Sequence, residues 1–122
     1  MVHLDYRDAR PIYAQIVDRF REQISAGVLE PGEKLPSVRE LAVQLSINPN
    51  TIQRSYRQLE MEGWITTMPG KGCFVCGVPQ STIDERDKYW GDFDWAVSAL
   101  LRCGVTRREL TQRLQKEGND NA

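Results

Sequence analysis

The chain has 122 residues, a formal net charge of −1 and 27% charged side chains. This length fits one small domain, or one small domain with an appendage, and leaves little room for a separate ligand-binding domain. No apolar run is long enough to span a bilayer and the first residues do not form a signal peptide, so we expect a cytoplasmic protein. Three cysteines without an export signal indicate reduced thiols rather than disulfides.

The first predicted helix begins at Arg10-Pro11, because proline is pre-set for an opening helical turn. It ends before Gly27, which supplies a stop signal. Apolar residues recur along it at four-residue spacing: Ile12, Ile16, Phe20 and Ile24. This spacing predicts an amphipathic helix with one face in the core and no separate function.

Two further helices are predicted between residues 37 and 62, joined by a tight turn. Ser37 and Glu40 form an S-x-x-E capping box at the start of the first. Asn48-Pro49 starts the second, with asparagine as the N-cap and proline in the first turn, and Gly63 ends it. The second of these helices has an apolar face formed by Ile52, Tyr56 and Leu59 and polar residues on its other faces.

A polar face of this kind suits a helix that reads a DNA major groove, although most polar helix faces are simply solvated. The charge distribution bears on the choice. The whole chain is acidic, which is unlike a typical nucleic-acid binder. From Lys34 to Arg57, however, four basic residues oppose one acid. Any DNA contact is therefore expected to be confined to this stretch and its neighbours, with affinity that falls with salt.

A β-hairpin is predicted after the helices, because the apolar period changes from 3.6 residues to about 2. The two short strands lie at 64–67 and 73–75, and the turn 68–72 contains Pro69, Gly70 and Lys71. The glycines permit a close approach of the backbone, and the lysine can reach a phosphate or a minor groove. Alone this would be an ordinary hairpin, but after a helix-turn-helix it is typical of the wing of a winged helix.

Beyond a short linker at 77–81, two small helices form a predicted tail. Gly104 separates them, and Thr106 with Glu109 makes a capping box for the second. The first of these helices has a main apolar stripe, formed by Trp90, Phe93, Val97, Leu100 and Leu101. Trp95 and Ala99 lie roughly opposite it, so the tail has a second apolar face that needs another partner. We expect the tail to make a homodimer through these residues: Trp90, Phe93, Trp95, Val97, Leu100, Leu101, Leu110 and Leu114.

Residues 10–76 resemble the DNA-binding domain of the GntR family of bacterial transcriptional regulators. The resemblance rests on motifs in the family's order, among them LEPG at 29–32, LPSVRELA at 35–42, NTI at 50–52 and GKG at 70–72. It implies three helices and a two-stranded wing. A winged helix followed by a short two-helix tail is similar to the YtrA subfamily, whose members are dimeric repressors often linked to transporter operons. The larger effector domains of other subfamilies are expected to be absent.

The resemblance also implies roles for single residues. Arg39 would hold the DNA backbone or a base edge, the first turn of the third helix would read bases, and Gly70 would enter the minor groove. Some family members carry arginine where this chain has Pro49 and Gln53, and glutamine suits adenine better than guanine, so the base preference does not transfer. The candidate DNA-binding residues are Ser37, Arg39, Asn48, Asn50, Thr51, Gln53, Arg54, Arg57, Gly70 and Lys71, with Arg57 expected on phosphate.

Three other functions compete with DNA binding: a metal site, an enzyme and a protein-binding module. The C-x-x-C of Cys73 and Cys76 would place the two thiols on opposite faces of a strand, which disfavours a metal site. His3 is the only histidine, which leaves little for nucleophilic catalysis, and no cofactor is expected. A winged helix that binds a protein partner instead of DNA is the main alternative.

The sequence therefore predicts a mainly helical fold with a small β-hairpin, consisting of a winged helix-turn-helix at 10–78 and a helical dimerisation tail at 79–122. The predicted function is a sequence-specific regulator of transcription that binds double-stranded DNA as a homodimer. It would act as a repressor on an inverted-repeat operator, with no enzyme activity and no membrane partner.

Overall fold

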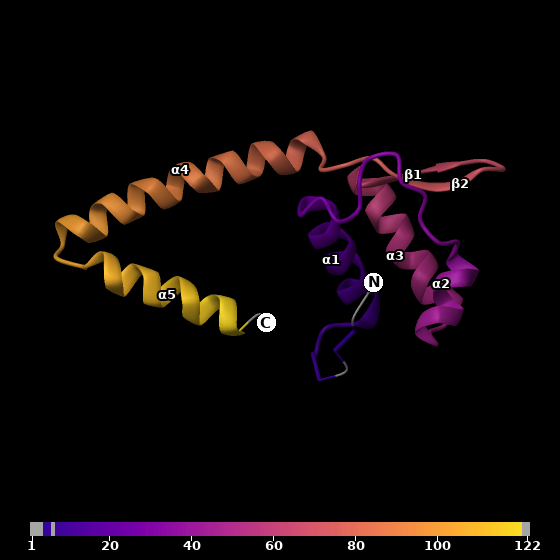
Figure 1. Ribbon diagram of the computed structural model, residues 1–122, viewed down its shortest axis with the longest axis horizontal. Helices are drawn as coiled ribbons and strands as arrows, with labels where there is room; N and C mark the ends of the chain where they lie inside the picture. Colours follow the sequence, from indigo (N-terminus) through magenta and orange to yellow (C-terminus); the bar gives the residue numbers. More distant parts are fainter. Residues whose placement is uncertain (1–3, 6, 121–122) are drawn as a thin grey trace. The chain divides into compact units, whose positions relative to one another are not determined.

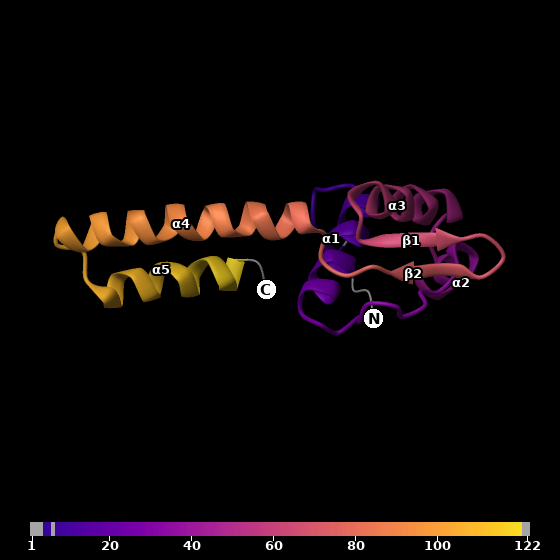
Figure 2. The same cartoon turned by 90° about the horizontal axis from the view of Figure 1, so that it is seen from above.

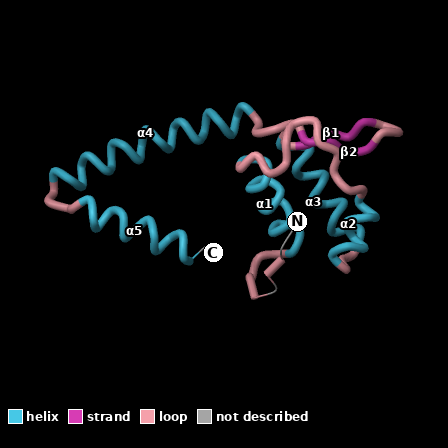
Figure 3. The backbone as a smooth tube through the Cα atoms, viewed as in Figure 1, coloured by secondary structure: helices cyan, strands magenta, loops and turns pink. Residues whose placement is uncertain are grey.

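The computed structural model describes residues 4–5 and 7–120, with side chains described to residue 116, and it divides into two compact units between Gln80 and Ser81. The elements run in the order α1 (Ile12–Ser25), α2 (Val38–Leu45), α3 (Pro49–Glu62), β1 (Ile65–Met68), β2 (Gly72–Val75), α4 (Gln80–Arg102) and α5 (Arg107–Asp120) (Figures 1 and 3). The predicted mainly helical fold with one small β-hairpin is confirmed. No helix among the described residues is long and apolar enough to cross a membrane.

The core of the first unit lies between α1, α2, α3 and the base of the hairpin. Phe20 of α1 and Tyr56 of α3 meet edge to face, with ring centroids 5.8 Å apart. The Tyr56 hydroxyl donates to the carbonyl of Pro36 at 2.7 Å, so the buried phenol is satisfied and also fixes the chain just before α2. The buried apolar residues are Ile16, Val17, Phe20, Ile24, Leu29, Leu35, Leu41, Ala42, Ile52, Tyr56, Leu59, Trp64, Ile65 and Val75.

The helix ends follow the predicted capping signals. The Ser37 hydroxyl accepts from the backbone N–H of Glu40 at 3.0 Å, and the Asn48 side chain accepts from the N–H of Asn50 at 2.8 Å. Within the described residues the Glu40 carboxylate makes no return bond, so only half of the capping box forms. Ser46, at φ 55°, takes the left-handed conformation in the turn between α2 and α3. These local bonds set the directions of α2 and α3.

The hairpin pairs β1 with β2 in antiparallel register, with Ile65 opposite Val75 and Met68 opposite Gly72. A third short segment joins it, because Lys34 forms an isolated bridge with Phe74 on the outer edge of β2. Seen from above in Figure 2, the hairpin extends alongside α3. The wing is thus attached both to α3 and to the segment that leads into α2.

The second unit consists of two helices, α4 and α5, which are joined by a short turn and spread apart from it in Figure 1. α4 has 23 residues and begins at Gln80, directly after Pro79. The predicted linker at 77–81 therefore ends two residues early, and the prediction of two small helices is wrong for α4. A proline needs no N–H partner and fits immediately before a helix, so Pro79 is compatible with this early start. α5 opens where the capping box places it, with the Thr106 hydroxyl accepting from the N–H of Glu109 at 3.2 Å.

Candidate nucleic-acid interface

The N-cap of α3 and the residues that it buries determine which of its side chains are exposed. Pro49 occupies the first turn, and Ile52, Ser55, Tyr56 and Leu59 point into the core. The Ser55 hydroxyl lies 3.1 Å from the carbonyl of Tyr13 in α1 and 3.0 Å from that of Thr51, so even the buried polar group of this helix is satisfied. Among the exposed residues of α3, three lie at positions i, i+3 and i+7 on one side of the helix: Asn50, Gln53 and Arg57.

A concave surface that encloses a volume of about 300 Å³ lies between this face and the wing. Gln53 and Arg57 line it from α3, Ser37 lines it from the start of α2, and Thr67 and Cys73 line it from the two strands. Hydrogen-bonding groups and a guanidinium are therefore brought together from α3, the start of α2 and both strands of the wing. This is a surface suited to base edges and phosphate oxygens.

The wing tip forms a second concave surface, of about 350 Å³, which also includes Ser37. Gly70 and Lys71 line it from the turn. Gly70 has φ +76° and no atom within 4 Å of the position where a Cβ would stand, so the turn is open to an approaching surface. The structure thus brings Ser37, Gln53, Arg57, Gly70 and Lys71 into two adjoining concave surfaces.

Glu60 holds the wing against α3. Its carboxylate accepts hydrogen bonds from the hydroxyl of Thr67 at 3.1 Å and from the backbone N–H of Thr67 at 3.3 Å. No sequence pattern predicts this contact, because the two residues become neighbours only when β1 folds back along α3. A carboxylate between α3 and the wing also limits the positive charge of this face.

Arg54 lies further round α3 than Gln53, and it shares a separate concave surface with Arg57, Gln58 and Glu62. Its guanidinium carbon lies 3.6 Å from the centroid of the Tyr13 ring in α1, which is cation–π geometry. Its charge is therefore directed along the side of α3 that meets α1. This contact with Tyr13 makes Arg54 a weaker candidate for reading bases than Gln53.

The remaining predicted DNA-binding residues lie at helix starts. Arg39 is exposed in the first turn of α2 and forms no ion pair within the described part of the chain. Asn48 is exposed but uses its side-chain oxygen to cap α3, and Thr51 is half-buried. Asn50 is therefore the freest of the predicted readers in the first turn of α3.

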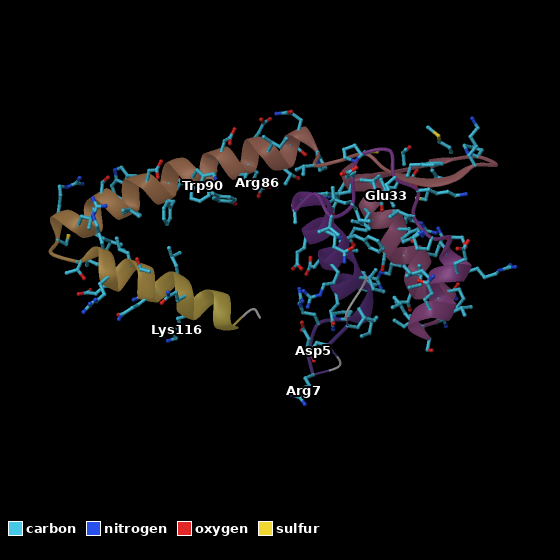
Figure 4. The ribbon with its side chains drawn as sticks, viewed as in Figure 1. Asp5, Arg7, Glu33, Arg86, Trp90 and Lys116 are labelled. Atoms are coloured by element: carbon cyan, nitrogen blue, oxygen red, sulfur yellow. The ribbon has the colours of Figure 1, made fainter. Side chains whose placement is uncertain are left out.

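The predicted dimerisation residues lie on the second unit. Trp90 and Phe93 of α4 meet edge to face, with centroids 5.4 Å apart, and Figure 4 shows Trp90 standing out from the helix. Trp95 is 72% exposed and Trp90 58%. Leu100, Leu101 and Leu114 are also exposed, while Val97 and Leu110 are half-buried. Such extensive apolar exposure is typical of an interaction surface.

No group of three or more potential metal ligands occurs among the residues that the structure describes, and His3 lies outside them. Burial raises the pKa of the Cys73 thiol, which lies in the concave surface beside Arg57. Cys76 and Cys103 are exposed. Burial and a raised pKa make Cys73 a weak nucleophile at neutral pH.

Comparison with known proteins decides the family. Residues 12–75 match the family model described as bacterial regulatory proteins, gntR family. The chain belongs to the GntR family. It is 42% identical to the transcriptional repressor YtrA of Bacillus subtilis over 70% of this chain and 65% of YtrA. It is 34% identical to the transcriptional regulator YhcF of the same organism over 90% of this chain and 92% of YhcF.

Solved structures of GntR proteins have the same fold. A GntR regulator from Listeria monocytogenes superposes with a TM-score of 0.63 at 35% identity, covering 93% of this chain and 98% of that one. The DNA-binding domain of AraR, solved in complex with operator ORE1, gives a TM-score of 0.53 at 28% identity, covering 62% of this chain and 93% of that one.

These findings confirm three expectations. The chain is a YtrA-like GntR protein, its first unit is a winged helix, and it is a DNA-binding regulator of transcription. Its relatives are named as regulators, and the family does not consist of enzymes. The match covers less than two thirds of YtrA, so what YtrA does as a whole protein does not transfer directly.

Proposed function

We propose that this GntR protein is a homodimeric repressor that reads an inverted-repeat operator with α3 and the wing of each copy. The observation that carries the proposal is the surface between α3 and the wing, where Gln53, Arg57 and Ser37 line one concavity and Ser37, Gly70 and Lys71 line the next. A DNA backbone following the wing would place base edges against the exposed face of α3.

The proposed division of roles follows from exposure and geometry. Asn50 and Gln53 are exposed near the start of α3 and carry amide groups that can pair with adenine. Arg57 is exposed one turn further on and suits a phosphate or a guanine edge. Arg39 of α2 and Lys71 of the wing turn contact the DNA backbone on either side of α3. The operator complex of AraR supports DNA as the occupant of this face.

Two copies are proposed because one recognition helix covers few base pairs. A two-fold dimer reads two half-sites one helical turn apart, roughly 34 Å. The exposed aromatic residues of α4, with Trp90 and Trp95 more than half exposed, supply an apolar surface for such a dimer. We therefore assign dimerisation to the tail in this proposal.

Repression is proposed from the name of one relative. YtrA is described as a transcriptional repressor, and a dimer seated on a promoter can block polymerase without any further domain. We infer a cytoplasmic location as well, because bacterial promoters lie in the cytoplasm.

The direct test is a mobility-shift titration with the DNA that lies upstream of the gene encoding this chain. We expect a shift at low salt that weakens as salt rises. Exchanging Arg57 for Ala together with Gln53 for Ala should remove the shift. Arg19→Ala, which removes the same charge from α1, serves as the control and should leave the shift in place. Loss of the shift in the control alone would contradict the proposed face.

A further inference from the structure

The segment before α2 is part of the wing sheet. The N–H of Val75 donates to the carbonyl of Glu33 at 2.9 Å, and the N–H of Leu35 donates to the carbonyl of Cys73 at 2.8 Å. Lys34 lies between these two bonds, and Figure 4 labels its neighbour Glu33 beside the strands. The backbone of Lys34 is therefore fixed against β2 and follows any movement of the wing.

The side chain of Lys34 lies across Gly72. Its Cε stands 2.8 Å from the position that a Cβ of residue 72 would take, and its Nζ stands 3.6 Å from it. Gly72 also has φ +121°, a conformation that favours glycine. The absence of a side chain at Gly72 thus makes room for the aliphatic stem of Lys34, which places the ammonium group at the wing.

The charge of Lys34 is available to a partner. Lys34 is exposed, and it forms no ion pair within the described residues. It lines the same concave surface as Gly70 and Lys71, together with the acid Glu40. Two lysines from separate segments therefore share the surface next to the wing tip.

We propose that Lys34 binds a DNA phosphate beside the wing, as a second cation to Lys71. The proposal rests on the DNA face described above and adds a contact that comes from outside the recognition helix and the wing turn. A phosphate is the chemistry that fits, because an exposed ammonium offers charge without base-reading geometry. Contact of the stem with Gly72 limits its freedom, which reduces the entropy lost when the phosphate binds.

Lys34→Met provides the sharpest test, because methionine keeps an unbranched stem over Gly72 and removes the charge. Binding to a short duplex of random sequence is measured by fluorescence anisotropy over a salt series, which requires no knowledge of the operator. We expect binding at low salt to be at least roughly tenfold weaker, from the loss of a charged hydrogen bond. The negative slope of log K against log salt should become less steep by about 0.9 for each bound copy of the chain. Lys34→Arg should restore both values.

Two results would overturn the inference. One is wild-type affinity and slope for Lys34→Met. The other is weaker binding with an unchanged slope, which would mean that Lys34 only packs against Gly72. A parallel series with Arg57→Met separates this inference from the wider proposal. If that variant also binds like the wild type, the proposed face fails; if it is weakened while Lys34→Met is not, the inference about Lys34 fails alone. Equal melting temperatures for the variants exclude unfolding as the cause.

Discussion

The guanidinium of Arg54 stacks on the ring of Tyr13, 3.6 Å from its centroid, and so joins α3 to α1 on the side of α3 that packs against α1. The neighbouring positions Gln53 and Arg57 line the concave surface beside the wing. The adjacent residues Gln53 and Arg54 therefore lie in different surroundings, with Arg57 between them on the helix surface. We propose that Arg54 supports the angle of the recognition helix, while Gln53 and Arg57 contact DNA.

This division predicts a stability effect for Arg54. Replacing Arg54 by Ala should lower the free energy of unfolding by about 0.5–1 kcal/mol, the usual range for an exposed cation–π pair. Base preference in a selection experiment should change little. Gln53→Ala is the matched comparison, with the opposite pattern: unchanged stability and altered preference. A larger change of base preference from Arg54→Ala than from Gln53→Ala would show that Arg54 reads bases.

Arg21 of α1 and Glu62 of α3 form an ion pair with 2.6 Å between Nη2 and Oε2, and this pair predicts a pH dependence of stability. Partial burial acts to raise the pKa of Glu62, but hydrogen bonds from Arg21 and Gln58 outweigh it and hold that pKa below its ordinary value of 4.5. Because the folded pKa is lowered, this stabilisation is present above pH 4.5 and is lost as the pH falls through the folded value.

Urea unfolding at several pH values measures this effect. Glu62→Gln should remove that part of the acid dependence and lower stability at neutral pH by about 1 kcal/mol, since the pair is partly exposed. Glu22→Gln, in a surface pair with Arg19, is the control and should change stability less. An identical acid profile for wild type and Glu62→Gln would mean that the ion pair does not contribute.

The contact between Glu60 and Thr67 predicts a role in placing the wing. Thr67→Val removes the hydroxyl that donates to Glu60 at 3.1 Å and leaves the strand's shape almost unchanged. We expect faster hydrogen exchange in β1 and β2 and weaker DNA binding, with little change in α1. Thr66→Val, on the other face of the same strand, is the comparison. Unchanged exchange in the hairpin would show that the wing is held by other contacts.

The exposed aromatic pair of α4 predicts the oligomeric state. Replacing Trp90 and Phe93 by Ala should weaken a dimer by about 2 kcal/mol or more, because buried aromatic residues dominate interfaces of this kind. Sedimentation velocity over a concentration series measures the change. Tyr89→Ala is the control, since Tyr89 is 57% exposed and Trp90 58%. If the double variant sediments as the wild type does, the tail does not form the dimer.

The sequence predicted those features that depend on neighbouring residues. Ser37 and Asn48 cap their helices through bonds to N–H groups two or three positions away, so their patterns are visible in the sequence. Contacts between distant segments left no such pattern. Arg54 on Tyr13 and Lys34 across Gly72 depend on how α1, α3 and the wing pack, and the fold must be known before either can be found.

The most direct test of the central claim is selection of binding sites by the full chain from a library of random duplexes. We expect the selected sequences to contain an inverted repeat with half-sites about one helical turn apart, 10–10.5 base pairs. Gln53→Ala should lose preference at one position in each half-site. Selection of no common sequence, or of a single unrepeated site whose preference survives Gln53→Ala, would contradict a dimer that reads DNA with α3.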